Sequence, residues 1–462
     1  MRPVVRVRLK ADTTPVPVKA DPTSTIAPAP YSQLIGMSAA FATSNFARMA
    51  ISFATSLVVG RALGVDDFGR WTLCIAWASL LTSLADFGFG VLLTRDAAQN
   101  DPGIGRAVTV ALIVRAGSLL PATLLFALMP ALLASDAATA EGFRIVPAIA
   151  IAGTLYGCLS AVFRAWPRTL VASLGIETAG ALGQWAVSWW LVRSGYGLTA
   201  LLAVAAAVQG LQLAAASALW FRVASVGRPF QGRQPGMRLE WPSRATIVRT
   251  VREAWPFAAA GIIANVQGRL APVLLGFLAA PAALAAFGVA SRIGGLVRIL
   301  PQSAFAGALP VLSHEARMGT SEAVRARFDR TLFAFAVAAA AGVVLLAAPF
   351  VSWTYGDGFA AAVVPLVWTG VGLIPTLVNS GRKVYLYASG LERPAVKWSG
   401  VALVIQAAAC AVLIPPFGPA GAAAALAFGE AAVWWPLHKV AIKAGELAGT
   451  PVGIVSDSPL VG

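Results

Sequence analysis

Charged residues are scarce in this chain of 462 residues: Asp, Glu, Lys and Arg together make up 12% of it, whereas a soluble domain carries about 25%. Hydrophobic residues account for 58%. Since one membrane crossing needs about 20 apolar residues, so much apolar sequence cannot belong to a soluble domain with a single anchor. The composition predicts an all-α integral membrane protein with many crossings of a lipid bilayer.

Cysteine and histidine are also few. The three cysteines, Cys74, Cys158 and Cys410, all fall in apolar runs without a paired spacing, and only His314 and His438 could accompany them. We therefore expect no disulfide framework and no metal site. No other cofactor is expected either.

Acidic residues number 20 against 35 basic ones. In a soluble chain this excess would suggest a nucleic-acid partner, but here most Lys and Arg lie in short segments between apolar runs. There they act as topology signals, so we expect no nucleic-acid partner. The segments on one side of the membrane hold 26 basic residues and those on the other side 4, which predicts that both termini are cytoplasmic.

Apolar segments follow one another along most of the chain. The twelve segments span 34–59, 71–94, 107–133, 145–165, 169–192, 197–221, 254–278, 283–312, 331–354, 360–381, 398–415 and 418–437. The longest interruption between them, 222–252, divides them six and six. The sequence thus predicts about 12 transmembrane helices in two lobes.

The predicted domain boundaries follow from this division. Residues 1–32 are basic and polar, without the apolar core and cleavage site of a signal peptide, and we expect a disordered cytoplasmic tail there. The expected order after it is an N-terminal six-helix lobe (33–222), a basic cytoplasmic linker (223–252), a C-terminal six-helix lobe (253–440) and a cytoplasmic tail (441–462).

An internal repeat supports the two lobes. At a constant offset of 219, residues 68–97 align without gaps on 287–316 and share seven identities, among them Phe68-Gly69 with Phe287-Gly288. The aligned segments have the same place in their halves, so the repeat is parallel. Two-lobed bundles of this kind commonly hold a solute site between the lobes, and we expect a central cavity.

Charged residues inside the predicted crossings mark where that cavity lies. They are the basic residues Arg48, Arg115, Arg269, Arg292 and Arg298 and the acidic residues Asp86, Glu177 and Glu430. A charge at mid-bilayer costs about 2.5 to 3.5 kcal/mol, so such side chains face protein or a water-filled cavity. Any single arginine could pair with an acid and fasten two helices, but three acids cannot neutralise five arginines. The excess indicates a cavity for an anion, because guanidinium groups bind phosphate and carboxylate through paired hydrogen bonds.

Arg48 and Arg269 lie near the middle of the first segment of each half. Asn45 and Asn265 precede them at nearly the same spacing, in "NFAR" and "NVQGR". We therefore assign both arginines and both asparagines, together with the other intramembrane arginines, to the anion site.

The acidic residues leave alternatives open. Asp86 and Glu177 could each be the partner of an arginine, a proton or sodium site, or a polar residue in helix packing, and both are candidates for ion coupling. Glu430 lies close to the cytoplasmic end of its segment, where we expect it to be interfacial.

The stretch "GRALGVDDFGRWTLCIAWASLLTSLADFGFGVLLTRDAA" (60–98) resembles the first hairpin of bacterial polysaccharide transporters, the Wzx-type flippases of the multidrug/oligosaccharidyl-lipid/polysaccharide exporter superfamily. The residues that match the pattern of that hairpin are Leu63, Gly64, Phe68, Gly69, Asp86, Gly88, Gly90 and Arg95. The stretch 265–293 is similar to the hairpin of helices 7 and 8, although an alanine-rich connection replaces the usual acidic, Gly-ended loop. The likeness spans 33–440.

This resemblance implies a transporter rather than an enzyme. A Wzx-type flippase moves an undecaprenyl-diphosphate-linked oligosaccharide from the cytoplasmic to the periplasmic leaflet of the bacterial inner membrane, driven by a proton or sodium gradient, for surface or exopolysaccharide assembly. The implied partners are this lipid-linked substrate, the bilayer and polysaccharide assembly proteins. The diphosphate is the anion that the resemblance assigns to the cavity.

Three other functions compete with this one. A multidrug exporter of the same superfamily would hold a cationic drug against intramembrane acids, and the arginine excess argues against it. A membrane polysaccharide polymerase or ligase would use a substantial extracytoplasmic loop, and every loop on that side is about a dozen residues or shorter. A scaffold that docks partners on 222–252 is the third, and a basic linker explains that segment more simply.

Overall fold

The computed structural model describes residues 31–99, 103–133, 136–225, 239, 241–298, 321–389 and 391–449. All regular structure in these ranges is helical. The elements are α1 (Tyr31–Asp86), α2 (Phe89–Ala98), α3 (Ile104–Leu133), α4 (Ala137–Phe163), α5 (Pro167–Arg193), α6 (Leu198–Ser225), α7 (Arg244–Leu278), a helix over 281–298, α9 (Ser321–Thr354), the short 3-10 helix η1 (Asp357–Ala362), α10 (Val363–Ala388), α11 (Glu392–Ala432) and α12 (Trp434–Gly449). The tail residues 1–30 and 450–462 and the end of the predicted eighth crossing lie outside the described residues.

Eight of the described helices are long and apolar enough to cross a membrane. Two of these, α1 and α11, are each long enough for two crossings, since the apolar part of α1 alone has 47 residues and so spans about 70 Å. Each bends at a glycine with positive φ, Gly64 at 73° and Gly418 at 52°, a backbone that other residues adopt only at a cost. The bends lie between predicted segments 1 and 2 and between 11 and 12, and the all-helical fold with about 12 crossings is confirmed.

Local sequence signals fix where helices begin. Asp136 caps α4 by accepting a hydrogen bond from the Thr139 N–H, and Ser243 caps α7 in the same way through Thr246, as Asp and Ser commonly do. Pro167 opens α5, where its missing N–H costs nothing.

The predicted linker 223–252 is helical at both ends, because α6 extends to Ser225 and α7 already begins at Arg244. The helical start of α7 is explained by its apolar face. Ile247 and Val251 pack against the buried cluster of α2, α3, α4 and α6, so this part of α7 is held by the N-terminal lobe.

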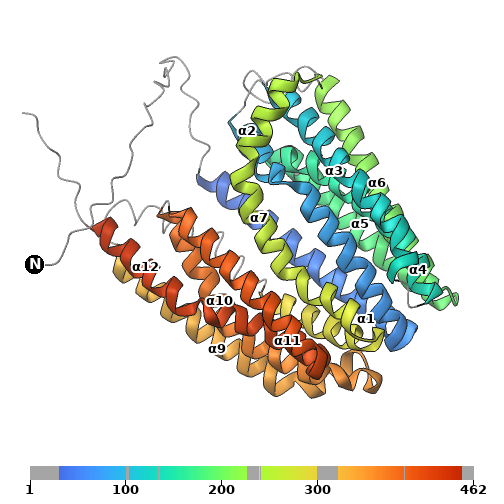
Figure 1. Cartoon of the computed structure of the whole chain (residues 1–462). Coiled ribbons are helices and arrows are strands. Elements are labelled where there is room, and N and C mark those ends of the chain that lie inside the picture. The colour runs from blue at the N-terminus through green and yellow to red at the C-terminus, as the bar shows by residue number, and fades with distance from the viewer. Residues whose placement is uncertain are drawn as a thin grey trace, which may run out of the picture.

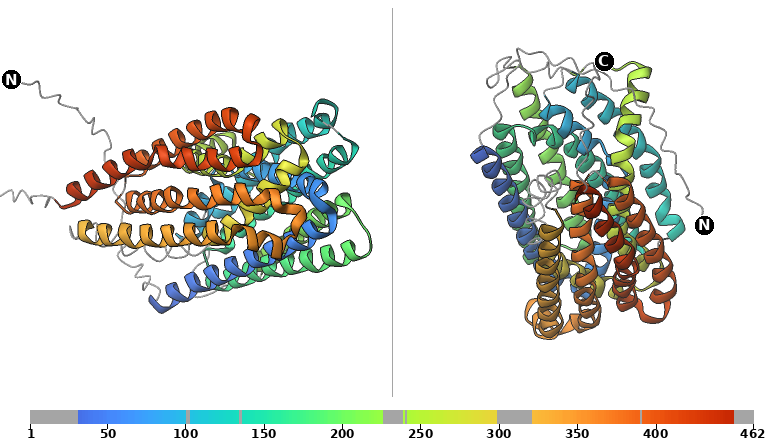
Figure 2. Two further views of the ribbon diagram at one scale, coloured as in Figure 1. Left: turned by 90° about the horizontal axis from the view of Figure 1, so that it is seen from below. Right: turned by 90° about the vertical axis from the view of Figure 1, so that its left-hand side faces the viewer.

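The long helices run side by side in two groups (Figures 1 and 2). In Figure 1 the blue-to-green helices α2 to α6 form one group and the orange-to-red helices α9 to α12 the other, and the groups diverge toward the upper left of the view. Helices α1 and α7 pack against each other between the groups. This is the predicted division into two lobes with a central space.

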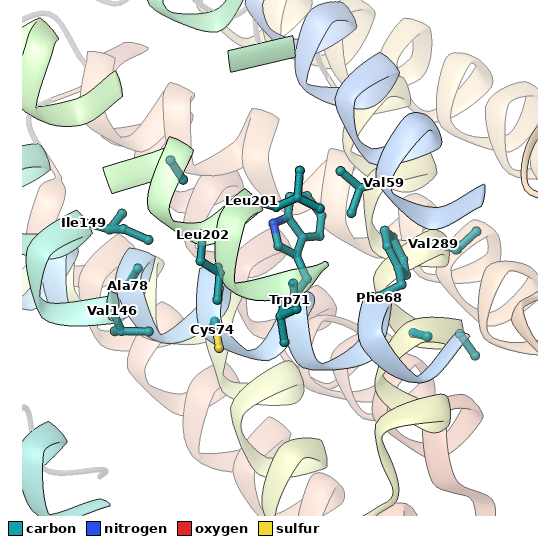
Figure 3. Close-up of a cluster of buried hydrophobic side chains, with 14 of the residues drawn as sticks. Val59, Phe68, Trp71, Cys74, Ala78, Val146, Ile149, Leu201, Leu202 and Val289 are labelled. Carbon is teal, nitrogen blue, oxygen red and sulfur yellow. The ribbon is translucent and has the colours of Figure 1, made fainter. Parts of the chain in front are cut away.

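The two lobes meet in one hydrophobic cluster at the end of the bundle where α1 bends. Figure 3 shows Phe68 and Trp71 of α1 in this cluster together with Val289 of helix 281–298. The same cluster continues to Tyr355 and Leu366 of the C-terminal lobe. Apolar packing therefore joins the lobes at this end.

Two glycines that the repeat aligns, Gly69 and Gly288, lie at the contact between the lobes. A Cβ atom on Gly69 would lie 1.9 Å from the backbone oxygen of Pro281, and one on Gly288 would lie 2.9 Å from the hydroxyl of Thr72. Neither position has room for a side chain. The repeated Phe-Gly pair thus lets the second helix of each lobe approach its counterpart.

Candidate functional site

A cavity of about 1210 Å³ lies between the two lobes. Its walls are formed by α1, α4, α5 and α6 on one side and by α7, helix 281–298, α10 and α11 on the other. The charged residues that line it are Arg48, Arg164, Glu177, Arg269, Arg292, Arg298, Lys383 and Glu430. Six of these are basic and two are acidic, so the wall carries a clear excess of positive charge.

The structure brings most of the predicted site residues together at this cavity. Those that line it are Arg48, Arg269, Arg292, Arg298, Asn265 and Glu177. Three others, Asn45, Arg115 and Asp86, are not part of its wall.

Arg115 is placed away from the cavity because it is bound between helices. Its side chain is 1% exposed, forms an ion pair with Asp86 at the end of α1, and donates to the backbone oxygen of Thr154 on α4 at 2.9 Å. Asp86 is thus the partner of an arginine in this structure, and its role in ion coupling stays a prediction. The pair fastens α1, α3 and α4.

Glu177 on α5 is the centre of a charged group in the N-terminal lobe. Its carboxylate is 6% exposed and forms an ion pair with Arg48 of α1. Arg164, at the end of α4, lies 3.6 Å from the same carboxylate, and the Tyr156 hydroxyl donates to it at 3.2 Å. One acid thus partly neutralises two arginines.

Glu430 forms the corresponding group in the C-terminal lobe. It accepts hydrogen bonds from Gln267 of α7 at 2.7 Å and from the Asn379 amide of α10 at 2.8 Å, and Lys383 lies 3.6 Å away. Gln406 of α11 holds the backbone oxygen of Gln267 at 3.0 Å. Glu430 is 4% exposed and is held between α7 and α10, while its expected position at the membrane interface stays a prediction.

The two groups are related by the internal repeat. Arg164 and Lys383 are 219 residues apart, which is the offset of the repeat, and each lies 3.6 Å from the buried carboxylate of its lobe. Arg48 and Gln267 are separated by the same offset. Arg48 contacts the carboxylate of Glu177, and Gln267 contacts that of Glu430. The sequence analysis did not single out Arg164 and Lys383, and the repeat offset is the signal that could have found them.

Three arginines of the C-terminal lobe have no carboxylate within ion-pair distance in the part of the chain that the structure describes. They are Arg269 on α7 and Arg292 and Arg298 on helix 281–298. Their charges are therefore not offset by an ion pair. Most of their guanidinium donors also stay available, since the Arg292 Nη1 donates to Thr72 and the Arg298 Nε to the backbone oxygen of Gly294.

Aromatic rings hold Arg292 in place. Its guanidinium carbon lies 4.8 Å from the ring centre of Trp71 and 5.0 Å from that of Phe68, and its Nη1 donates weakly to the Thr72 hydroxyl at 3.4 Å. Cation–π contacts of this kind orient a guanidinium without cancelling its charge. The N-terminal lobe therefore fixes the position of Arg292 on the cavity wall.

The cavity is closed at the end where α1 bends. There the Ser56 and Tyr355 hydroxyls are hydrogen-bonded at 2.7 Å, and the Arg61 Nε donates to the backbone oxygen of Thr354 at 2.6 Å. The Tyr355 ring packs 5.9 Å from that of Phe68. All three contacts join the two lobes, so separating the lobes here would break them together.

Comparisons with known proteins agree with this architecture. A family model described as polysaccharide biosynthesis protein matches residues 38–314. No curated protein gives a significant match.

Solved structures share the fold. The chain is similar to a multidrug resistance MATE family transporter of the MOP superfamily in an inward-facing conformation, with a TM-score of 0.69 and 14% identity over 88% of this chain and 96% of that one. It is similar to the lipid II flippase MurJ in an inward closed conformation, with a TM-score of 0.68 and 11% identity over 88% and 89%. A MOP superfamily transporter from Pyrococcus furiosus, whose reversed binding-pocket polarity suggests a different function, gives 0.59 at 13% identity over 90% and 96%.

Proposed function

Because the chain belongs to the polysaccharide biosynthesis protein family, we propose that it transports a lipid-linked oligosaccharide across the bacterial inner membrane. The substrate is an undecaprenyl-diphosphate-linked repeat unit, and the protein is a flippase rather than an enzyme. Its reaction moves the head group from the cytoplasmic to the periplasmic leaflet, where polysaccharide assembly proteins take it up.

The observation that carries this proposal is the set of three arginines, Arg269, Arg292 and Arg298, that face the cavity without a carboxylate partner among the described residues. A diphosphate supplies the negative charge and the paired acceptor oxygens that guanidinium groups prefer. A cavity of about 1210 Å³ exceeds the size of most small-molecule pockets, which suits a head group of several sugars.

The positive charge also separates this proposal from drug export. A cationic drug would be repelled by six basic residues and met by only two acids, both already engaged in ion pairs. The MOP superfamily transporter from Pyrococcus furiosus gives a precedent for pocket polarity as the property that distinguishes functions on this fold.

Alternating access supplies the mechanism. With the basic segments in the cytoplasm, the cavity reaches the cytoplasmic ends of α4 and α10, at Arg164 and Tyr387, and is closed toward the periplasm by the Ser56 and Tyr355 contact. The substrate enters from the cytoplasmic leaflet, and separation of the lobes at the periplasmic end releases it. Glu177 is the candidate for ion coupling, because protonation of its carboxylate would release Arg48.

Reconstitution tests the proposal. Purified protein in proteoliposomes is expected to move undecaprenyl-diphosphate-linked oligosaccharide between leaflets, as read by accessibility of the glycan to a lectin added outside. Transport of a cationic dye with no movement of the lipid-linked glycan would favour the multidrug exporter instead.

A further inference from the structure

Three glutamine side chains face the cavity from the N-terminal lobe. Gln184 lies on α5, and Gln209 and Gln212 lie on α6. All three are partly exposed, and no hydrogen bond within the described residues involves their amides. Each amide therefore offers two donors and one acceptor to whatever occupies the cavity.

Two glycines lie next to these amides, and one of them makes room for Gln212. A Cβ atom on Gly180 would lie 2.1 Å from the Gln212 Nε2, so the Gln212 side chain occupies the space that a larger residue at 180 would fill. A Cβ atom on Gly153 of α4 would lie 3.6 Å from the Gln209 oxygen. Gln184 is one helical turn beyond Gly180 on the same face of α5, which brings the three amides into one group, the glutamine cluster.

The glutamine cluster and the unpaired arginines differ in chemistry and lie on opposite lobes. The wall formed by α7 and helix 281–298 carries the full charges of Arg269, Arg292 and Arg298, while the cluster is neutral. An amide, with a donor and an acceptor side by side, matches the hydroxyl and acetamido groups of sugars and does not select for charge. The glutamine cluster is thus a neutral part of the N-terminal wall, beside the charged group of Glu177, Arg48 and Arg164, and is suited to a neutral glycan. The wall of the other lobe is suited to phosphate.

We propose that the glutamine cluster is a subsite for the neutral, hydroxyl-rich or N-acetylated sugars of the substrate. The glycan then lies against α5 and α6 while the diphosphate lies against α7 and helix 281–298. This inference rests on the proposed function, and it places selectivity for the glycan in the N-terminal lobe, apart from recognition of the diphosphate.

Two probes separate the subsites: undecaprenyl diphosphate without sugar, and undecaprenyl diphosphate carrying a neutral disaccharide of N-acetylglucosamine. Binding of each to purified protein in nanodiscs is measured for wild type and for Gln209→Met/Gln212→Met, which keeps the side-chain length and removes both amides. We expect the double variant to bind the glycosylated probe about tenfold more weakly, as for the loss of two hydrogen bonds of modest net strength. Binding of the bare diphosphate should be unchanged.

A matched pair of glycine variants controls for damage to the helices. Gly180→Ala should displace the Gln212 amide without removing it and should weaken only the glycosylated probe. Gly153→Ala introduces an ordinary contact at 3.6 Å and should bind both probes like wild type. Alanine favours a helix over glycine, so both variants should fold.

The outcomes are distinct. Equal weakening of both probes in the double variant, or no weakening of either, would overturn the glutamine subsite. Equal binding of the two probes by wild type would also contradict the glutamine subsite, but it would leave the proposed diphosphate site unaffected. If wild type binds neither probe, the proposed function itself fails.

Discussion

Arg48 on α1 and Glu177 on α5 form an ion pair at the wall of the cavity, and Arg164 approaches the same carboxylate at 3.6 Å. The positive charge of the N-terminal wall is therefore partly cancelled by one buried acid. The three unpaired arginines, Arg269, Arg292 and Arg298, lie on the other lobe. The repeat therefore places equivalent residues on both walls of the cavity, but the two walls carry different charge.

Glu177→Gln should release both arginines without changing the size of the side chain. Since a neutral amide cannot hold a guanidinium as a carboxylate does, we expect undecaprenyl diphosphate to bind about tenfold more tightly, the equivalent of one charge-assisted hydrogen bond. Transport should become slower and lose its dependence on an ion gradient. Titration of the lipid into nanodiscs measures the affinity, and proteoliposomes measure the transport.

Glu253→Gln is the control for Glu177→Gln. It removes one negative charge from an exposed ion pair with Arg249 on α7, which is not part of the cavity wall. Unchanged affinity in Glu177→Gln, or an equal gain in both variants, would contradict the role assigned to this pair.

Asp86 and Arg115 should be important for stability and not for transport. Asp86→Ala leaves the guanidinium of Arg115, which is 1% exposed, without its carboxylate. Because the Asp86 side chain is 41% exposed, solvent can partly replace it, and we expect a loss on the order of 2 kcal/mol in the free energy of unfolding. Thermal unfolding in detergent measures this loss. The double variant Asp86→Ala/Arg115→Met should recover much of this loss and keep gradient-dependent transport. If it folds and loses only the gradient dependence, Asp86 is a coupling residue after all.

Tyr355→Phe should increase the fraction of molecules in which the cavity is open at the end where α1 bends. It removes the 2.7 Å hydrogen bond to Ser56 and should raise the open population about fivefold for a bond of about 1 kcal/mol. A cysteine at Val59, which is 1% exposed in the closed contact, reports the opening through its labelling rate with an impermeant thiol reagent. The three native cysteines are buried and give little background.

Tyr196→Phe, in which an exposed tyrosine away from the lobe contact loses the same hydroxyl, should leave the labelling rate of the Val59 cysteine unchanged. Equal rates in Tyr355→Phe and wild type would show that this contact does not control access.

Asp136, which caps the N-terminus of α4, should make the stability of that helix end depend on pH. Its burial raises the pKa of the carboxyl, but hydrogen bonds from the Thr139 N–H and from Arg70 outweigh burial and hold that pKa below its ordinary value. The stabilisation is therefore present above the ordinary pKa of about 4 and is lost as the pH falls through the lowered pKa of the folded state.

Asp136→Asn keeps a side chain that can cap the helix but removes the charge that faces Arg70, so it should cost about 1 kcal/mol at neutral pH. The difference from wild type should shrink below about pH 4. Thermal unfolding across pH measures this difference. Asp66→Asn, at an exposed carboxylate on α1 outside this hydrogen-bond group, is the control. A difference that stays constant down to pH 2 would contradict the assignment.

Hydropathy alone was enough to predict the fold. Runs of about 20 apolar residues specify crossings because the bilayer leaves the backbone no other way to satisfy its polar groups. The division into two lobes and the family resemblance are confirmed as well. The helical structure of residues 244–252, at the start of α7, was not predicted. A polar helix that packs on a neighbouring lobe has the composition of a linker, so composition alone does not distinguish the two.

The site could be predicted only in part. Arg48, Arg115 and Arg269 have the same appearance in the sequence, and only helix packing decides that the first pairs with Glu177, the second is buried with Asp86 and the third faces the cavity unpaired. The glutamine cluster was missed for a different reason: neutral polar residues inside a transmembrane segment commonly form hydrogen bonds between packed helices, so they do not mark a ligand site by themselves.

The central claim, that unpaired arginines of the C-terminal lobe bind the diphosphate, is tested most directly by the affinity of undecaprenyl diphosphate for Arg269→Gln/Arg298→Gln in nanodiscs. Arg193→Gln, at the exposed end of α5 away from the cavity, is the matched control. We predict at least a tenfold loss of affinity in the double variant, as expected for charge-assisted hydrogen bonds, with the control binding like wild type. Wild-type affinity in a correctly inserted double variant would contradict it.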